Sequence, residues 1–110
     1  MQIAARRLDK ITIFDISGDI DLATSPELRK GLLRELRELR TPRVVLNLKS
    51  VRYIDSSGVA SLVEALKASR DVGSRLILFG LNRTVRDVLQ LSKLARIFEI
   101  YEDEAQSVSP

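Results

Sequence analysis

The chain contains neither cysteine nor histidine. Without cysteine it can form no disulfide bond and offers no thiol nucleophile, a composition that fits a reducing cytosol. Without histidine it cannot build a Ser-His-Asp or Cys-His catalytic group, and the usual zinc sites are excluded as well. Very little enzyme chemistry at neutral pH remains, so we expect a protein that is not an enzyme and that holds no metal or other cofactor.

Aromatic residues and long apolar runs are also scarce. Aromatic side chains make up 5% of the sequence, and the arginines are spread along the chain instead of gathering in one arm. Both features disfavour direct binding to nucleic acid. Residues Met1–Arg7 lack the apolar core of a secretion signal, and no apolar run approaches the roughly 20 residues that span a bilayer. We therefore expect a cytoplasmic protein without membrane insertion.

The two signs of charge are unevenly distributed. The formal net charge is +3, but all 18 Lys and Arg residues lie at or before Arg96. Residues 1–96 therefore carry +7, from 18 basic and 11 acidic side chains, whereas the segment from Glu99 to Glu104 is acidic. A basic body of this kind is compatible with nucleic acid, an anionic membrane or an acidic protein, and of these nucleic acid is disfavoured by the scarcity of aromatic residues.

The hydrophobic pattern predicts one α/β domain over residues 1–110. Hydrophobic residues make up 45% of the sequence, enough for one continuous core. Short apolar runs alternate with stretches of helical spacing, which predicts a mixed β-sheet of about four to five strands covered by about three to four helices. The polar segment 102–110 is expected to fray or to form a loose last turn. Strands are expected at 11–16, 44–48, 76–79 and 97–101, with residues 1–7 beside the first.

Two local patterns precede the second apolar run. Residues Ser17–Asp21 break the strand pattern and are interpreted as an acidic turn. Thr24-Ser25-Pro26-Glu27 resembles a capping box with Thr24 as the helix N-cap. On the helix that follows, we interpret the basic residues, with Glu35 and Glu38 among them, as a solubilising face. The core stripe of this helix is predicted to be Leu28, Leu32, Leu36 and Leu39.

The quartet Asp55-Ser56-Ser57-Gly58 is the stretch around which the chain is organised. The apolar run Val44–Leu48 predicts a buried strand, a short polar connection follows it, and helical spacing begins at Val59. Either serine can serve as the helix N-cap, with Asp55 at the positive end of the helix dipole and Gly58 allowing a close turn. The local pattern alone favours this structural interpretation. In the functional interpretation, one hydroxyl accepts a phosphate, which adds about −1.5 to −2 charges next to helix N–H donors.

Three motifs resemble the STAS domain of bacterial anti-sigma factor antagonists, also called anti-anti-sigma factors. Gly18-Asp19-Ile20-Asp21 is similar to the Gly-Glu-Leu-Asp turn of that family, Val45–Leu48 to its central strand, and Ile54–Gly58 to its signature loop. The resemblance extends from about Leu8 to Tyr101. Two departures are that Asp19 stands where glutamate is usual and that Val59-Ala60 replaces the common Leu-Gly.

The resemblance implies a protein-interaction switch. The unmodified form would bind an anti-sigma factor that is also an ATP-dependent serine kinase, and would thereby free the sigma factor. The kinase would phosphorylate Ser56 and abolish binding, and a serine phosphatase would reset the switch. In this hypothesis, Ser57 and Gly58 shape the loop, and Asp19 and Asp21 contribute to docking. The implied partner-binding residues are Asp19, Asp21, Asp55, Ser56, Ser57 and Gly58.

Two alternatives remain open at this stage. The same domain type also resembles accessory subunits of lipid-transport complexes and scaffolds of stress-signalling assemblies, in which no phosphate is needed. An enzyme or a small-ligand binder has little support, because the acidic residues lack histidine or cysteine partners and the chain has no Gly-rich phosphate-binding motif.

Overall fold

One mixed β-sheet organises the chain, which a computed structural model describes over residues 1–110. The chain has five strands and four α-helices, which alternate from the second strand onward and confirm the α/β prediction. A π-helical turn extends the first helix, and a 3₁₀ turn precedes the last strand. The elements are β1 (Gln2–Leu8), β2 (Ile11–Ile20), α1 (Ser25–Leu33) with the π turn (Arg34–Glu38), β3 (Arg43–Ile54), α2 (Ser56–Asp71), β4 (Arg75–Phe79), α3 (Arg83–Leu91), the 3₁₀ turn (Ala95–Ile97), β5 (Glu99–Tyr101) and α4 (Glu104–Val108).

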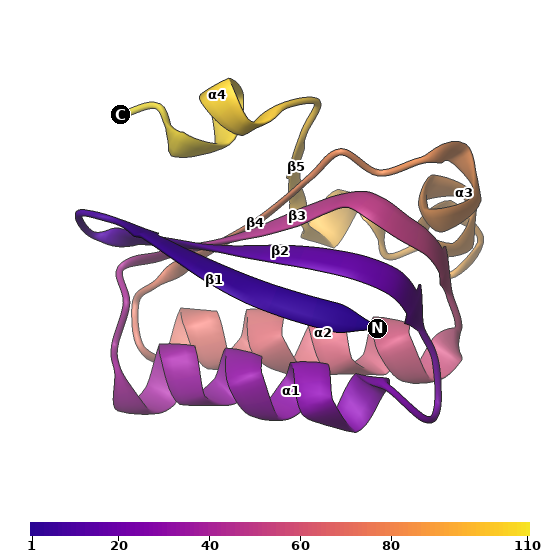
Figure 1. Cartoon of the computed structure of the whole chain (residues 1–110), viewed down its shortest axis with the longest axis horizontal. Coiled ribbons are helices and arrows are strands. Elements are labelled where there is room, and N and C mark those ends of the chain that lie inside the picture. The colour runs from indigo at the N-terminus through magenta and orange to yellow at the C-terminus, as the bar shows by residue number, and fades with distance from the viewer.

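The strands lie in the sheet in their sequence order. β1 runs antiparallel to β2, and the other neighbouring pairs are parallel. Helices α1 and α2 lie on one face of the sheet, whereas α4 lies on the other (Figure 1). Because β2 and β3 are parallel neighbours, their C-terminal ends lie together, and the connections that leave them begin at the same end of the sheet.

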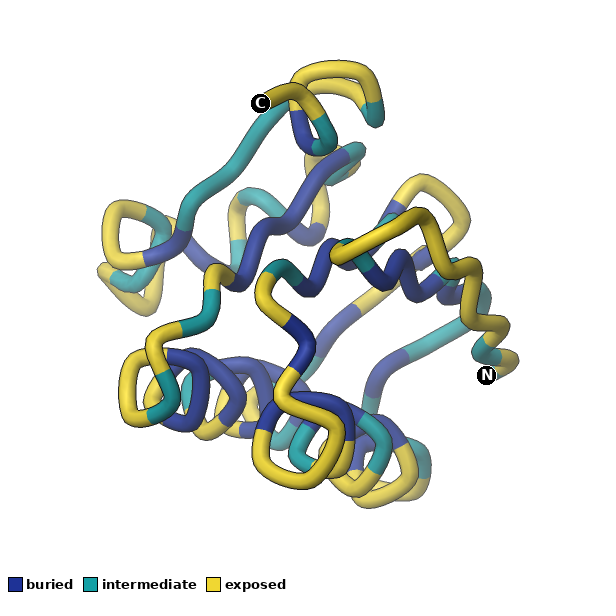
Figure 2. Tube along the Cα trace, turned by 90° about the vertical axis from the view of Figure 1, so that its left-hand side faces the viewer, coloured by how far each residue is buried: buried dark blue, intermediate teal, exposed yellow.

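Alternate strand residues face opposite sides and build two apolar clusters. Leu46 and Leu78 belong to the larger cluster, which also includes side chains of α1, α2 and α3. Figure 2 shows these buried strands and the buried inner sides of the helices, whose outer turns are exposed. The smaller cluster lies on the other face and consists of the fully buried residues Ile13, Val45, Ile77 and Phe79.

The C-terminal segment, for which we expected either fraying or a loose last turn, forms the short helix α4 and covers this smaller cluster. Val108 of α4 packs against the cluster, and Ser107 is fully buried. Arg43 Nη1 donates hydrogen bonds to the carbonyl oxygens of Ser107, at 3.3 Å, and Ser109, at 2.7 Å. The Asp103 carboxylate caps α4 by accepting from an N–H in its first turn. Polar residues thus form a helix here because each end of the helix has a partner.

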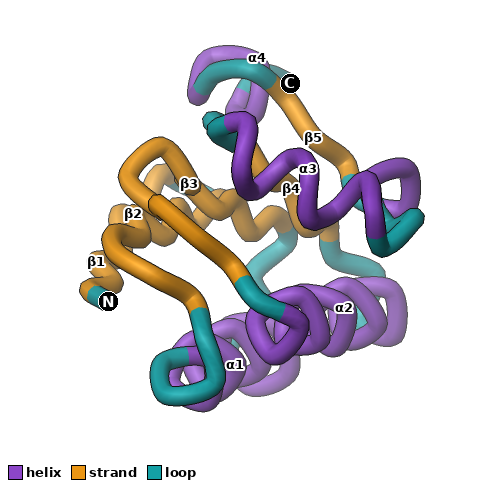
Figure 3. The backbone as a smooth tube through the Cα atoms, turned by 90° about the vertical axis from the view of Figure 1, so that its right-hand side faces the viewer, coloured by secondary structure: helices purple, strands orange, loops and turns teal.

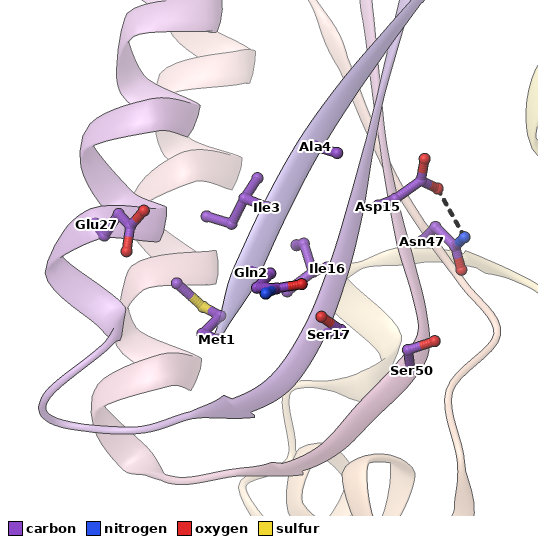
Figure 4. Close-up of a pocket in the computed structure, with 10 residues that line it drawn as sticks. All are labelled: Met1, Gln2, Ile3, Ala4, Asp15, Ile16, Ser17, Glu27, Asn47 and Ser50. Carbon is purple, nitrogen blue, oxygen red and sulfur yellow. Dashed lines mark hydrogen bonds between the residues drawn. The ribbon is translucent and has the colours of Figure 1, made fainter.

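A polar network ties the first strand to the same face. The Arg6 guanidinium pairs with the carboxylates of both Asp15, at 2.6 Å, and Glu104, at 2.7 Å. Asn47 Nδ2 donates to Asp15 Oδ1 at 2.8 Å (Figure 4). Hydrogen bonds from Arg6 and Asn47 hold the pKa of Asp15 below its ordinary value, although burial opposes them. The acidic end of the chain thus partly neutralises its basic body.

Two strands are longer than the sequence predicts. β2 continues to Ile20 through the segment that we interpreted as a turn, and β3 continues to Ile54 through the expected polar connection. The two extensions pair with each other as far as Ile20 and Ile54, so each provides backbone hydrogen-bond partners for the other. The register shifts near Gly18, whose φ of +92° favours glycine, so the bulge absorbs the glycine without ending the strand.

The first helix begins where predicted but differs in two details. The Thr24 side chain makes no capping hydrogen bond to this helix; its hydroxyl instead donates to Asp19 O of β2 and accepts from Asp21 N–H. Leu28, Leu32 and Leu36 are buried, but Leu39 is 47% exposed. The cause is the π turn, in which Leu39 N–H bonds to Arg34 O, because its wider turn rotates Leu39 away from the core.

Glu35 in the π turn is buried, contrary to our prediction of a solvent-facing residue. Its carboxylate accepts hydrogen bonds from Arg7 Nη1 at 2.8 Å, from Thr12 Oγ1 at 2.7 Å and from Thr41 Oγ1. Burial by itself raises the pKa of Glu35, but the hydrogen bonds from Arg7, Thr41 and Thr12 outweigh it, so the pKa lies below its ordinary value. This network joins β1, β2 and α1 at the end of the sheet opposite the connections after β2 and β3.

The later elements follow the predictions closely. Gly73 ends the segment after α2 with a φ of +71°, and Asn82 Oδ1 caps α3 by accepting from Val85 N–H at 2.8 Å. The last expected strand is split, since residues Ala95–Ile97 form the 3₁₀ turn and only Glu99–Tyr101 pair with β4.

We predict that Glu35→Gln destabilises the fold in a pH-dependent way. A carboxylate with a lowered pKa stabilises the folded state above its unfolded pKa, near 4.5, and this contribution is lost as the pH falls through the folded pKa. The substitution should lower the free energy of unfolding by about 1–3 kcal/mol near neutral pH, because the buried hydroxyls lose a charged acceptor. Denaturant titrations at several pH values should show the difference from wild type shrinking in acid.

The matched control is Glu38→Gln, on the same turn, where the side chain is 71% exposed. It should change stability by less than about 0.5 kcal/mol. A difference between Glu35→Gln and wild type that stays constant down to strongly acidic pH would contradict the assignment.

We also predict that Val108→Asp destabilises the fold by about 1–3 kcal/mol, because it places a carboxylate against the smaller apolar cluster. Ser109→Asp, one residue further on and exposed, should have little effect. Thermal unfolding of both variants measures the difference, and equal melting temperatures would show that α4 does not protect the cluster.

Candidate functional site

The two connections after β2 and β3 lie side by side (Figure 3). Two hydrogen bonds join them: Asp55 N–H donates to Ile20 O at 3.1 Å, and Leu22 N–H donates to Asp55 Oδ2, also at 3.1 Å. The carboxylate of the quartet therefore holds the β2–α1 connection against the start of α2.

Asp55 is also the N-cap of α2. Its Oδ1 accepts from Gly58 N–H at 3.0 Å, while its carbonyl oxygen accepts from Val59 N–H at 3.0 Å. Our prediction that a serine caps the helix was therefore wrong. The reason is that β3 continues to Ile54, which leaves Asp55 as the single residue between strand and helix, with the extended backbone of a cap and a side chain that reaches the first turn.

Gly58 allows α2 to approach the ends of both strands. A Cβ atom at this position would lie 2.6 Å from Ile54 Cγ1 and 2.8 Å from both Cγ2 and the carbonyl oxygen of Ile20. Real Cβ atoms do not come so close, so this glycine is required by packing rather than by backbone conformation. Its place in the quartet is structural.

The two serines differ in accessibility. Ser56 is the first residue of α2 and is exposed, and its hydroxyl makes no hydrogen bond within the chain. Ser57 is half-buried, and its carbonyl oxygen accepts from Ser61 Oγ at 3.2 Å. Of the two hydroxyls, Ser56 is thus the one that another protein can reach more easily.

The two aspartates of the β2–α1 region have different surroundings. Asp21 Oδ1 accepts from the N–H groups of Ala23 and Thr24, both at 3.0 Å, which fixes the connection beside Asp55. Asp19 lies within β2 and pairs with Arg52, with an N···O distance of 3.4 Å. The structure therefore brings Asp21 and the quartet together, whereas Asp19 lies in β2, just before Asp21, and contacts Arg52 of β3.

Sequence reasoning missed two exposed apolar side chains in this region. Leu22 follows Asp21 and is 75% exposed, and Tyr53 lies two residues before Asp55 and is 45% exposed. The only signal in the sequence is that each is a large apolar residue within a polar stretch, which does not separate it from a core residue.

A groove of about 520 Å³ begins at Ser56. One wall is α2, and the other is the segment around Ser92 and Leu94 that follows α3. The hollow beside β1 is separate from it, and Figure 4 shows Ser17, Asp15 and Asn47 among the residues there. The structure has no group of three or more acidic residues arranged to hold a metal ion, and none of its helices combines the length and apolar character needed to cross a bilayer.

Known proteins match the chain over nearly its whole length. Residues 2–107 match the STAS domain family. The anti-sigma-B factor antagonist of Listeria monocytogenes is 33% identical over 107 residues, which cover 96% of this chain and 91% of that protein.

Solved structures share the fold at lower sequence identity. A candidate anti-sigma factor antagonist from Thermotoga maritima superposes with a TM-score of 0.88 at 24% identity, over 94% of this chain and 89% of that one. The anti-sigma factor antagonist SpoIIAA in its unphosphorylated form gives 0.75 at 16% identity, over 96% and 92%. SpoIIAA of Bacillus in its phosphorylated form gives 0.76 at 18% identity, over 96% and 94%.

The family match and the identity to the Listeria protein confirm the resemblance seen in the Gly18–Asp21 and Ile54–Gly58 motifs, and the chain therefore belongs to the STAS domain family of anti-sigma factor antagonists.

Proposed function

We propose that the chain is a non-enzymatic anti-sigma factor antagonist that is switched at Ser56. The unmodified form binds a cognate anti-sigma factor with serine kinase activity and releases the sigma factor. The kinase then phosphorylates Ser56 in an ATP-dependent step, the complex dissociates, and a serine phosphatase restores the binding form. The observation that carries this proposal is the exposed Ser56 hydroxyl, unpaired and placed as the first residue of α2.

The surroundings of Ser56 suit a docking surface. The exposed apolar side chains of Leu22 and Tyr53 lie on the two connected segments next to the quartet. Exposed apolar groups beside a polar site are typical of surfaces that bind another protein. The hydrogen bonds of Asp21 and Asp55 hold these segments in place before any partner arrives, which reduces the entropy that is lost on binding.

The phosphate would act through local electrostatics. Enclosing a phosphate in an interface without a counter-charge costs several kcal/mol of desolvation, and about 4 kcal/mol weakens binding roughly a thousandfold. The start of α2 returns only about 0.3–1 kcal/mol to an exposed anion. Because Asp55 already occupies the Gly58 N–H, the modification requires no rearrangement of the cap. The phosphoform should therefore keep the fold and lose only the partner.

We predict that Ser56 is the phosphate acceptor. The protein is incubated with ATP and, in turn, each purified anti-sigma factor kinase of its source organism, and the phosphate is located by mass spectrometry. Ser56→Ala should remain unmodified and bind its partner constitutively. Ser57→Ala, which removes the adjacent hydroxyl, should still be phosphorylated. Absence of phosphate from Ser56 with every kinase would overturn the switch.

Binding measurements separate this function from an accessory or scaffold role. The affinity of Ser56→Asp for the anti-sigma factor should lie between those of wild type and the phosphoform, because aspartate adds one negative charge where phosphate adds about two. A stable stoichiometric complex with a transporter or scaffold subunit that Ser56→Asp leaves unchanged would favour the accessory role instead.

A further inference from the structure

The groove that begins at Ser56 follows one face of α2. Ser56, Ala60 and Val63 line it at spacings of four and three residues, and Lys67 follows four residues later. Residues at these intervals lie above one another on a helix. At a rise of about 1.5 Å per residue, the distance along the axis from Ser56 to Lys67 is about 16 Å, or three helical turns.

The groove is apolar in its middle and polar at its ends. Ala60 is exposed, Val63 is half-buried, and Leu94 contributes an apolar side chain from the opposite wall. The hydroxyl of Ser56 marks one end, and the ammonium group of Lys67 marks the other. Its length and apolar floor suit an amphipathic helix that lies along α2.

The charges at the far end favour an acidic group on the occupant. Glu64 lies beside Lys67 in the groove, but its carboxylate is already paired with Arg29 of α1. Lys67 is exposed and makes no ion pair within the chain, so its charge is uncompensated. A carboxylate on the occupant would meet this charge without displacing an existing pair.

We propose that this groove receives an amphipathic helix of the anti-sigma factor, with an apolar face over Ala60 and Val63 and a carboxylate that reaches Lys67. This inference rests on the proposed function and extends its docking surface about two and a half helical turns beyond the quartet. The groove is continuous with Ser56, so a helix seated in it would hold that hydroxyl near the kinase and would be disturbed at one end by the phosphate. The assignment also places partner contacts on residues outside the signature loop.

The test compares two arginine substitutions in the full chain. Ala60→Arg inserts a long charged side chain into the groove, whereas Ala105→Arg makes the same change at an exposed position on α4. The probe is the purified anti-sigma factor kinase that phosphorylates wild type. Ala60→Arg should raise its Kd about tenfold or more, and Ala105→Arg should change it by less than about twofold. Lys67→Glu should also weaken binding, and more strongly at low salt.

Crosslinking measures proximity directly when the labelled variants are saturated with kinase. Because the chain has no cysteine, Lys67→Cys and Ala105→Cys each carry a single photoreactive maleimide label. The label at position 67 should crosslink to the kinase, and the label at position 105 should not. Circular dichroism and unfolding curves identify any variant that fails to fold, in which case the crosslinks alone decide the proposal.

The outcomes distinguish failure of this proposal from failure of the function on which it rests. If no anti-sigma factor kinase binds wild type, the proposed function fails and the groove assignment fails with it. If wild type binds and neither the Ala60→Arg affinity nor the position-67 crosslink differs from its control, only the groove assignment is overturned. Loss of self-association in Ala60→Arg, with kinase binding intact, would make the groove a contact between two copies of this chain and would likewise overturn the proposal.

Discussion

The Asp55 carboxylate is the interaction on which the candidate site depends. One of its oxygens caps α2 through Gly58 N–H, and the other accepts from Leu22 N–H in the neighbouring connection. A single side chain thus sets both the start of the helix and the position of the loop beside it. Removing this carboxylate would leave the N–H of the buried residue Gly58 without its acceptor and would release the exposed Leu22 N–H to solvent. Ser56 gains its fixed, exposed position from this arrangement.

The strands below the site make this arrangement possible. The pairing of β2 with β3 continues to Ile20 and Ile54. The backbone of β3 is therefore fixed up to the residue that precedes Asp55. The absence of a side chain at Gly58 lets α2 rest directly on these two isoleucines. The site is therefore built on the ends of rigid elements, which position functional groups more accurately than a free loop does.

Periodicity predicted most of the fold, and the errors have identifiable causes. The helix and strand patterns located the five strands and the helices α1, α2 and α3, because apolar spacing reports which face is buried, but they did not predict α4 or the π and 3₁₀ turns. Periodicity did not locate the ends of β2 and β3. The segment Lys49–Tyr53 is mostly polar and Gly18 is a glycine, so neither has a strand pattern of its own, and each is held as strand by its pairing with the other. Leu39 and Glu35 exchanged their expected environments because a π turn cannot be read from an α-helical pattern. At the site, the motif indicated Ser56 as the candidate, and the structure shows it exposed. The cap was assigned to a serine because the single-residue connection at Asp55 depends on where β3 ends.

The Glu35 network lies at the end of the sheet opposite Asp55, and this separation has an evolutionary consequence. Under the proposed function, substitutions around Leu22, Tyr53 or Ala60 would alter partner choice through exposed side chains and leave the buried carboxylate and its hydroxyl donors untouched. Under that proposal, related domains can diverge in partner choice at the Asp55 end of the sheet while the Glu35 network at the opposite end keeps the fold stable. Paralogues within a single genome could be insulated from one another in this way without each having to rediscover a stable scaffold.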